Sequence, residues 1–116
     1  MPLPEVQQLL SEAKQQIKEI DVQELKRMKQ SGEDFALVDV REASEVAQGT
    51  IPDAVPISRG TLEFSIDKLT TDKNKKLVLY CAGGGRSALA AANLKKMGFR
   101  NVMSLAGGYN AWKQSA

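Results

Sequence analysis

The chain has 116 residues, of which 42% are hydrophobic and 26% charged, and its formal net charge is +2. This length suits one domain with a buried core, is too short for two independent cores, and comes with a composition that argues against disorder. The sequence contains no histidine, which excludes a Ser-His-Asp triad, a Cys-His dyad and nearly all zinc sites, so no metal or other cofactor is expected.

No apolar run approaches the roughly 18 residues of a membrane span. The first residues also lack a basic region followed by an apolar one, so neither membrane insertion nor export is expected. Cys81 is the only cysteine, which excludes an intramolecular disulfide. A reducing cytoplasm is therefore the predicted location.

The first half of the chain predicts two helices and two strands. Apolar residues at helical spacing make the first sixteen residues an added N-terminal helix, and residues 17–20 alternate like a short strand. Asp21, with Glu24 three positions later, resembles a capping box at the start of the next helix. Residues 35–40 are apolar without alternation, as expected of a strand buried on both faces.

The second half continues the same alternation of strands and helices. The predicted elements are a short helix at 42–48, a proline-containing segment around 52–57, a short helix near 62–69, a buried strand at 76–80, a helix at 87–97, a strand at 102–105 and a final helix after Gly107-Gly108.

This alternation predicts an α/β fold, an open and mostly parallel sheet with helices on both faces. The predicted organisation is an N-terminal helical extension over 1–16 and one domain over 17–116. Open sheets of this kind bind ligands at the carboxyl ends of their strands. Cys81 directly follows the strand at 76–80 and is therefore expected at such an end.

Cys81 begins a glycine-rich connection to the next helix. Backbone N–H groups converge at a helix N-terminus, and the helix dipole there favours negative charge. Such surroundings lower the pKa of a thiol, so Cys81 can ionise without a histidine base. Glycines at 83–85 let the loop curl around the sulfur. Arg86 adds a cation, and Ser87 can cap the helix while its amide points inward.

Two other interpretations of the Cys81 loop remain open. A lone cysteine can be an inert core residue. A glycine-rich turn can bind nucleotide phosphates, although this one lacks the spacing and lysine of a Walker sequence.

The formal charge is divided unevenly along the chain, because residues 1–72 sum to −6 and residues 73–116 to +8. Folding can interleave the two halves, or the basic half can create a positive field around Cys81 that suits small anions; nucleic acid is a weaker option because aromatic residues are only 5%.

Four segments of the chain resemble the rhodanese-like sulfurtransferases in their single-domain form, and the resemblance runs from about Ile17 to Trp112. The segments are Leu37-Val38-Asp39-Val40-Arg41-Glu42, Gly49-Thr50-Ile51-Pro52-Asp53-Ala54, Cys81-Ala82-Gly83-Gly84-Gly85-Arg86-Ser87 and Leu105-Ala106-Gly107-Gly108-Tyr109-Asn110-Ala111-Trp112. One departure lies in the second segment, where the family usually has His and Gly in place of Thr50 and Asp53, and it concerns the local turn.

The resemblance implies that Cys81 attacks a small anionic sulfur donor, such as thiosulfate, or a persulfide. Cys81 would keep one sulfur as a persulfide and pass it to cyanide, a thiol or a protein acceptor. A site without a base suits this reaction, because a thiolate needs no deprotonation and sulfite or thiolate leaves readily. No nucleic acid or membrane partner is implied. The residues expected to hold the outer sulfur are Ala82, Gly83, Gly84, Gly85, Arg86 and Ser87.

The resemblance leaves two alternatives to sulfur transfer, an oxyanion enzyme and a non-catalytic binding module. Phosphatases and arsenate reductases have a catalytic loop one residue longer, whereas this loop spans six residues from Cys81 to Arg86. Non-catalytic binding modules typically lack the cysteine. Among supporting residues, Asp39 and Arg41 are expected to tie a strand end to the loop, and Arg59 is a candidate anion contact near the mouth of the site.

Overall fold

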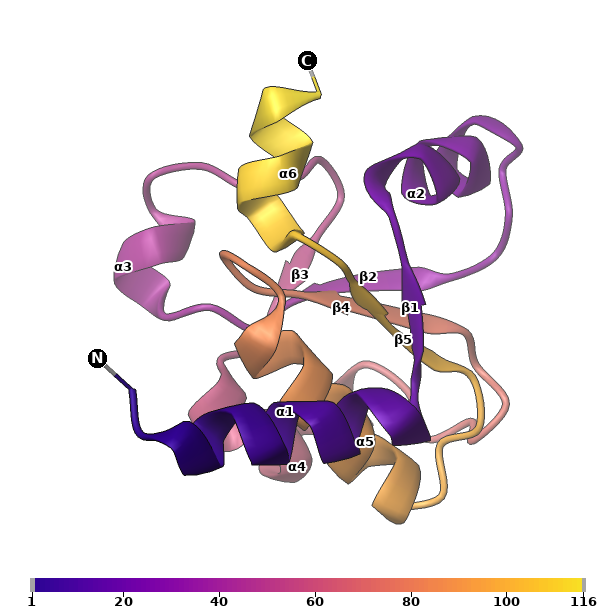
Figure 1. The fold of residues 1–116 in the computed structure, drawn as a ribbon. Coiled ribbons are helices and arrows are strands. Elements are labelled where there is room, and N and C mark those ends of the chain that lie inside the picture. The colour runs from indigo at the N-terminus through magenta and orange to yellow at the C-terminus, as the bar shows by residue number, and fades with distance from the viewer. Residues whose placement is uncertain (1, 116) are drawn as a thin grey trace.

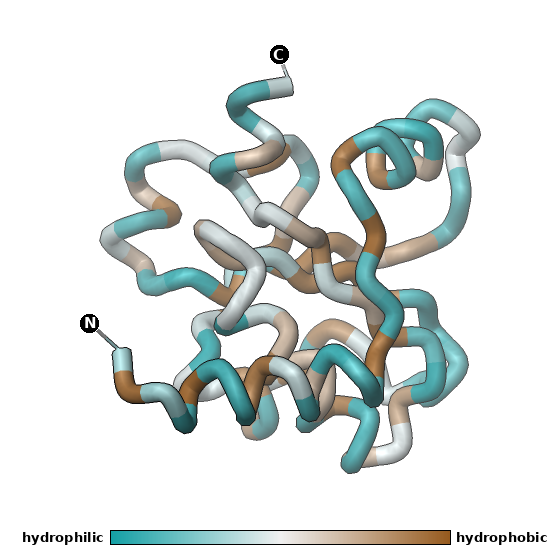
Figure 2. Tube along the Cα trace, in the orientation of Figure 1, coloured by the Kyte–Doolittle hydropathy of each residue, from teal (hydrophilic) through white to brown (hydrophobic). Residues whose placement is uncertain are grey.

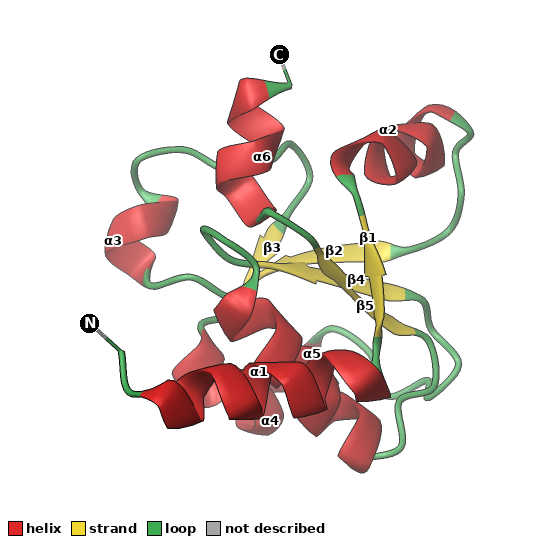
Figure 3. Cartoon of the chain, viewed as in Figure 1, coloured by secondary structure: helices red, strands yellow, loops and turns green. Residues whose placement is uncertain are grey.

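Within residues 2–115, five parallel strands form one sheet in the order β1-β5-β4-β2-β3. The computed structural model describes residues 2–115, and Figure 3 shows the strands surrounded by helices. The sheet confirms the predicted α/β fold. The strands are β1 (Lys18–Ile20), β2 (Ala36–Asp39), β3 (Val55–Pro56), β4 (Leu77–Tyr80) and β5 (Val102–Leu105).

Helices cover both faces of the sheet, with α1, α4 and α5 on one face and α2 and α6 on the other, while α3 lies beyond the carboxyl ends of the strands (Figure 1). None of the helices within residues 2–115 is long and apolar enough to cross a bilayer. The helices are α1 (Pro4–Gln16), α2 (Val22–Gln30), α3 (Ala43–Val46), α4 (Leu62–Ser65, between 3-10 turns at Arg59–Thr61 and Ile66–Lys68), α5 (Gly85–Lys96) and α6 (Gly108–Gln114).

The central strand β4 is fully buried and divides its side chains between two cores. Leu77 and Leu79 face the α4 and α5 side, whereas Val78 and Tyr80 face the α2 and α6 side. This explains the apolar run without alternation, because successive side chains of a strand point to opposite faces and both faces are covered here. Figure 2 shows the hydrophobic residues concentrated in these central strands.

Both edges of the sheet are short. β3 at one edge has two residues, and its Pro56 has no backbone N–H to offer another strand. β1 at the other edge has three residues, of which Lys18 and Glu19 are exposed. β3 was not predicted, since a two-residue strand leaves no periodic pattern to detect.

The N-terminal helix packs against its own domain. α1 lies along α5, and Ala13 is its buried residue. Leu10 approaches Gly85 so closely that a Cβ on Gly85 would lie 3.6 Å from Leu10 Cδ2. Helix α1 therefore contacts the first turn of α5, which follows the Cys81 loop directly.

Asp53 adopts a backbone conformation that is unusual for a residue with a side chain. Its φ is +72°, and it follows Pro52 in a turn that the Ala54 N–H closes by donating to the Ile51 carbonyl at 3.2 Å. Proline at the second position and a positive φ at the third are typical of a type II turn, which favours glycine at the third position. The departure from the family pattern thus places a strained residue in an otherwise ordinary turn.

Replacing Asp53 with glycine should stabilise the domain. Removing the Cβ relieves the strain of the left-handed backbone conformation, whereas the greater freedom of glycine in the unfolded chain opposes this gain. The net increase in the free energy of unfolding should be about 0.5–1 kcal/mol. Urea denaturation of Asp53→Gly should show a higher midpoint with an unchanged slope. Asp53→Ala serves as the control, because it removes the carboxylate near Lys29 and keeps the strain. A glycine variant no more stable than the alanine variant would contradict this assignment of strain.

Candidate active site

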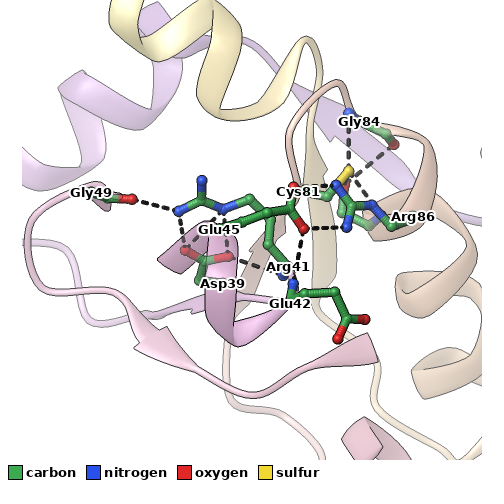
Figure 4. Close-up of polar contacts among 9 residues, drawn as sticks. Asp39, Arg41, Glu42, Glu45, Gly49, Cys81, Gly84 and Arg86 are labelled. Atoms are coloured by element: carbon green, nitrogen blue, oxygen red, sulfur yellow. Dashed lines mark hydrogen bonds and ion pairs between the residues drawn. The ribbon is translucent and has the colours of Figure 1, made fainter. Parts of the chain in front are cut away.

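The Cys81 sulfur lies at the carboxyl end of β4, inside the loop that leads into α5 (Figure 4). The backbone N–H of Gly84 donates to Sγ at 3.1 Å, and that of Ser87 donates at 3.4 Å. The Cys81 residue is only 1% exposed. The loop therefore does curl around the sulfur, as its glycines predict, and Gly84 does so with a φ of +104°.

These hydrogen bonds favour the thiolate form of Cys81. Burial raises the pKa of Cys81, but hydrogen bonds from the Ser87 hydroxyl and from the backbone N–H groups of Ser87, Gly84 and Gly83 outweigh it, so the pKa is lowered overall. Each of these donors favours the thiolate over the thiol. The geometry therefore favours a nucleophilic sulfur without a neighbouring base.

A second hydroxyl, that of Ser104 on β5, stands behind Ser87. The two oxygens lie 2.8 Å apart, and both residues are fully buried. Either hydroxyl can donate in this pair. The Ser87 hydroxyl donates to the Gly84 carbonyl at 3.2 Å and lies 3.5 Å from Cys81 Sγ, where it accepts from the thiol and can donate to the thiolate. Sequence reasoning missed Ser104, and its one signal is a polar residue in a buried strand.

The start of α6 fixes the other side of the loop. The Tyr109 N–H donates to the Cys81 carbonyl at 2.8 Å, and the Asn110 N–H donates to the Ala82 carbonyl at 3.0 Å. This approach requires glycine at position 108, because a Cβ there would collide with the Cys81 carbonyl oxygen and lie 2.7 Å from that of Ala82. Gly107-Gly108, noted in the sequence as the start of a helix, thus also orients the peptides that follow Cys81.

Arg86 is held by an acidic residue that sequence reasoning missed. Glu45 on α3 accepts from both terminal nitrogens of the guanidinium, at 2.7 and 2.9 Å (Figure 4). Hydrogen bonds from Arg86, and then from the backbone N–H of Glu42, lower the pKa of Glu45 to about 2, so this carboxylate is ionised at neutral pH. The cation beside the loop is therefore neutralised.

The same pairing answers the question of how the two differently charged halves of the chain combine. Arg86 pairs with Glu45, and Lys75 pairs with Asp34 at 2.7 Å. In each pair the base comes from the second half of the chain and the acid from the first. Folding thus interleaves the halves, so the charge imbalance of the sequence is not carried over as separate acidic and basic surfaces at these positions.

Asp39 and Arg41 form a buried ion pair beside the loop. Asp39 is 0% and Arg41 is 4% exposed, and the Arg41 Nη2 lies 2.7 Å from a carboxylate oxygen of Asp39. Arg41 also donates to the Gly49 carbonyl at 2.7 Å, and the Tyr80 hydroxyl donates to Asp39 at 2.6 Å. Burial, together with the bond to Asp39, raises the pKa of Tyr80. The pair therefore links the end of β2 to the residue before Cys81.

Arg59 lies away from these contacts. Its guanidinium donates to Glu63 at 3.0 and 3.2 Å, and within residues 2–115 its side chain has no hydrogen bond to the Cys81 loop. It lines a surface groove between α1 and α5 together with Leu9 and Leu89. The structure thus brings together the loop, Asp39 and Arg41, and leaves Arg59 outside this group.

Comparison with known proteins assigns the family. The profile of the rhodanese-like domain matches residues 21–115. This chain belongs to the rhodanese-like family. A sulfurtransferase of Allochromatium vinosum is 36% identical, over 83% of this chain and 88% of that protein. The thiosulfate sulfurtransferase GlpE of Pseudomonas savastanoi is 34% identical, over 84% of this chain and 89% of that protein. These relatives support sulfur transfer as the general chemistry of this rhodanese-like domain.

A solved structure extends the similarity to the N-terminal helix. The structure of a Rhodopseudomonas palustris protein of unknown function, described as a possible tyrosine phosphatase, covers 99% of this chain and 96% of its own with 35% sequence identity. The TM-score is 0.87. The rhodanese-like fold of this chain, α1 included, therefore has an experimental counterpart.

The hydroxyl pair behind the sulfur generates a test of the thiolate. Ser87→Ala removes a hydroxyl that can donate to Sγ and should raise the pKa of Cys81. At a pH below this pKa the fraction of thiolate should fall about tenfold, the order expected when a hydrogen bond to a charged group is lost. Ser104→Ala should raise the pKa less, since it acts through Ser87. The measurement is the pH dependence of alkylation by iodoacetamide. Ser11→Ala, on the exposed face of α1, should change nothing; an unshifted Ser87→Ala profile would show that the hydroxyl is not a donor.

The buried ion pair generates a test of stability. Arg41→Met leaves the Asp39 carboxylate buried without its cation, which should lower the free energy of unfolding by about 3–5 kcal/mol. The matched variant Arg59→Met breaks the more exposed pair with Glu63 and should cost less than about 1 kcal/mol. Urea denaturation compares the two. Equal losses would mean that Asp39 finds another partner when Arg41 is absent.

Proposed function

We propose that this domain transfers a sulfane sulfur from thiosulfate or a persulfide donor to cyanide or a thiol through a persulfide on Cys81, in a reducing compartment such as the cytoplasm. A protein thiol is a further possible acceptor under this proposal. The main observation behind this proposal is that the Cys81 sulfur accepts hydrogen bonds from two backbone N–H groups in a chain without histidine. Relatives described as sulfurtransferases, one of them a thiosulfate sulfurtransferase, support the same chemistry.

In the first half-reaction the Cys81 thiolate attacks the outer sulfur of thiosulfate. A bond forms between Sγ and that sulfur, the sulfur-sulfur bond of thiosulfate breaks, and sulfite leaves with the electron pair. With a persulfide donor the leaving group is a thiolate. Neither leaving group requires a proton at the moment of departure, which is why a site without an imidazole suffices.

In the second half-reaction the acceptor attacks the outer sulfur of the persulfide. Cyanide forms a carbon-sulfur bond and becomes thiocyanate, and the Cys81 thiolate is regenerated as the leaving group. The backbone amides that stabilise the thiolate at the start therefore stabilise it again at the end. The loop from Ala82 to Ser87 is proposed to hold the outer sulfur between the two steps.

Phosphatase or arsenate-reductase activity is the rival function, and the description of the Rhodopseudomonas palustris protein motivates testing it. Two observations favour sulfur transfer. The loop spans six residues from Cys81 to Arg86, the length that the resemblance associates with sulfur transfer. The Arg86 guanidinium, which would bind a tetrahedral oxyanion in the rival reaction, is engaged by Glu45. A non-catalytic module would not require the hydrogen bonds that favour the thiolate form of Cys81.

Intact-mass measurement after incubation with thiosulfate tests this proposal. Wild-type protein should gain about one sulfur atom, about 32 Da, which a reductant removes. Cys81→Ser should gain nothing, because it has no other cysteine, and should keep the wild-type unfolding midpoint. Hydrolysis of p-nitrophenyl phosphate should stay at background. Phosphatase turnover exceeding thiocyanate formation would instead establish the rival function.

A further inference from the structure

We propose that Glu45 is a specificity-determining residue that engages the Arg86 guanidinium and balances its charge, so that the site favours sulfane-sulfur donors with at most one negative charge over dianionic thiosulfate. The inference rests on the proposed function and concerns the donor class of the same site. Persulfides are donors of the favoured kind, and thiosulfonates share their low charge.

Arg86 forms a bidentate ion pair with Glu45. Both terminal nitrogens donate to the two carboxylate oxygens of Glu45, at 2.7 and 2.9 Å. A bidentate pair of this kind occupies the Nη1–Nη2 edge of the guanidinium, one of the edges through which arginine binds an oxyanion. A dianion that used this edge of Arg86 would first have to displace a carboxylate already in place.

The second step concerns how firmly Glu45 is held. One of its oxygens also accepts from the Glu42 backbone N–H at 3.0 Å, so the start of α3 fixes the carboxylate from the other side. The two side chains of the pair are only partly exposed, 39% for Arg86 and 32% for Glu45. The pair is thus built into the contact between α3 and the start of α5, and is not formed by two freely moving surface side chains.

The charges around the sulfur complete the argument. The Cys81 thiolate is negative, Arg86 with Glu45 is neutral, and Asp39 with Arg41 is neutral. The pKa of Cys81 is lowered by hydrogen bonds from the uncharged groups of Ser87, Gly84 and Gly83. Arg86 also interacts with Cys81, which contributes to the raised pKa of Arg86, but the charge of this guanidinium is balanced by Glu45. An arriving donor therefore meets one net negative charge, and repulsion grows with the negative charge of the donor.

Methanethiosulfonate and thiosulfate form a matched pair of probes. Methanethiosulfonate has a methyl group where thiosulfate has a charged oxygen, so it carries one negative charge in place of two. In both cases the thiolate forms a bond to the outer sulfur, the bond from that sulfur to the sulfonyl sulfur breaks, and the electron pair leaves on methanesulfinate or sulfite. The measured quantity is the ratio of kcat/KM for the two donors, with cyanide as acceptor.

Glu45→Gln should shift this ratio toward thiosulfate. The amide keeps an oxygen for the Glu42 N–H but removes the charge, which frees Arg86 for the donor. KM for thiosulfate should fall about tenfold, the order of one charge-assisted hydrogen bond, while KM for methanethiosulfonate falls less. Glu42→Gln removes an equal charge from the exposed neighbour and should leave the ratio within about twofold of wild type by ordinary screening.

The double variant Glu45→Gln/Arg86→Gln separates a freed guanidinium from a changed local field. Its two side chains carry no net charge, as in the wild-type pair, but it has no guanidinium at position 86. The ratio of kcat/KM for the two donors should therefore return to the wild-type value. An unchanged ratio in Glu45→Gln, or a shift that persists in the double variant, would overturn the inference while leaving sulfur transfer intact. Failure of both donors to load wild-type Cys81 would instead overturn the proposed function.

Discussion

The buried ion pair between Asp39 and Arg41 is the interaction on which the site depends. Burying two charges is costly unless each finds a partner and its remaining hydrogen bonds are satisfied. Arg41 achieves this by reaching the Gly49 carbonyl, and Asp39 by accepting the Tyr80 hydroxyl. Tyr80 in turn accepts from the Ile51 N–H at 3.1 Å. One charge pair thereby fixes the end of β2, the 49–51 segment and the residue before Cys81.

Around this fixed point the loop is shaped almost entirely by backbone groups. The amides of Gly84, just before α5, and of Ser87 in its first turn donate to the Cys81 sulfur, and amides in the first turn of α6 donate to the carbonyls of Cys81 and Ala82. Neither arrangement requires a reactive side chain other than the cysteine. It does require backbones to approach each other closely, and glycine at 84 and 108 permits that approach.

The sequence was sufficient for the features that leave a periodic or compositional pattern. Four of the five strands of the parallel sheet, the burial of the strand before Cys81 and the glycine-rich loop all follow from such patterns, whereas the two-residue strand β3 does not. The partners of Arg86 and Ser87 did not, because Glu45 lies 41 residues and Ser104 lies 17 residues away along the chain. A polar residue in a short helix or a buried strand has no sequence signature of the side chain it will meet once the strands are ordered.

Arg59 shows that the direction of a side chain can also depend on a partner close by in the sequence. Its segment lies near the active-site mouth in the family, yet its side chain pairs with Glu63, one helical turn later. A pair four residues apart is a local contact that could have been anticipated from spacing. Proximity along a family segment predicts where the backbone runs, and local partners then decide where a long side chain points.

The short edges of the sheet have a consequence for the behaviour of the protein at high concentration. An exposed strand with free N–H and C=O groups invites a second molecule to extend the sheet, which is a route to aggregation. Here one edge ends in Pro56, which lacks the donor, and the other exposes Lys18 and Glu19. The sheet is therefore poorly suited to being extended by a strand of a second molecule.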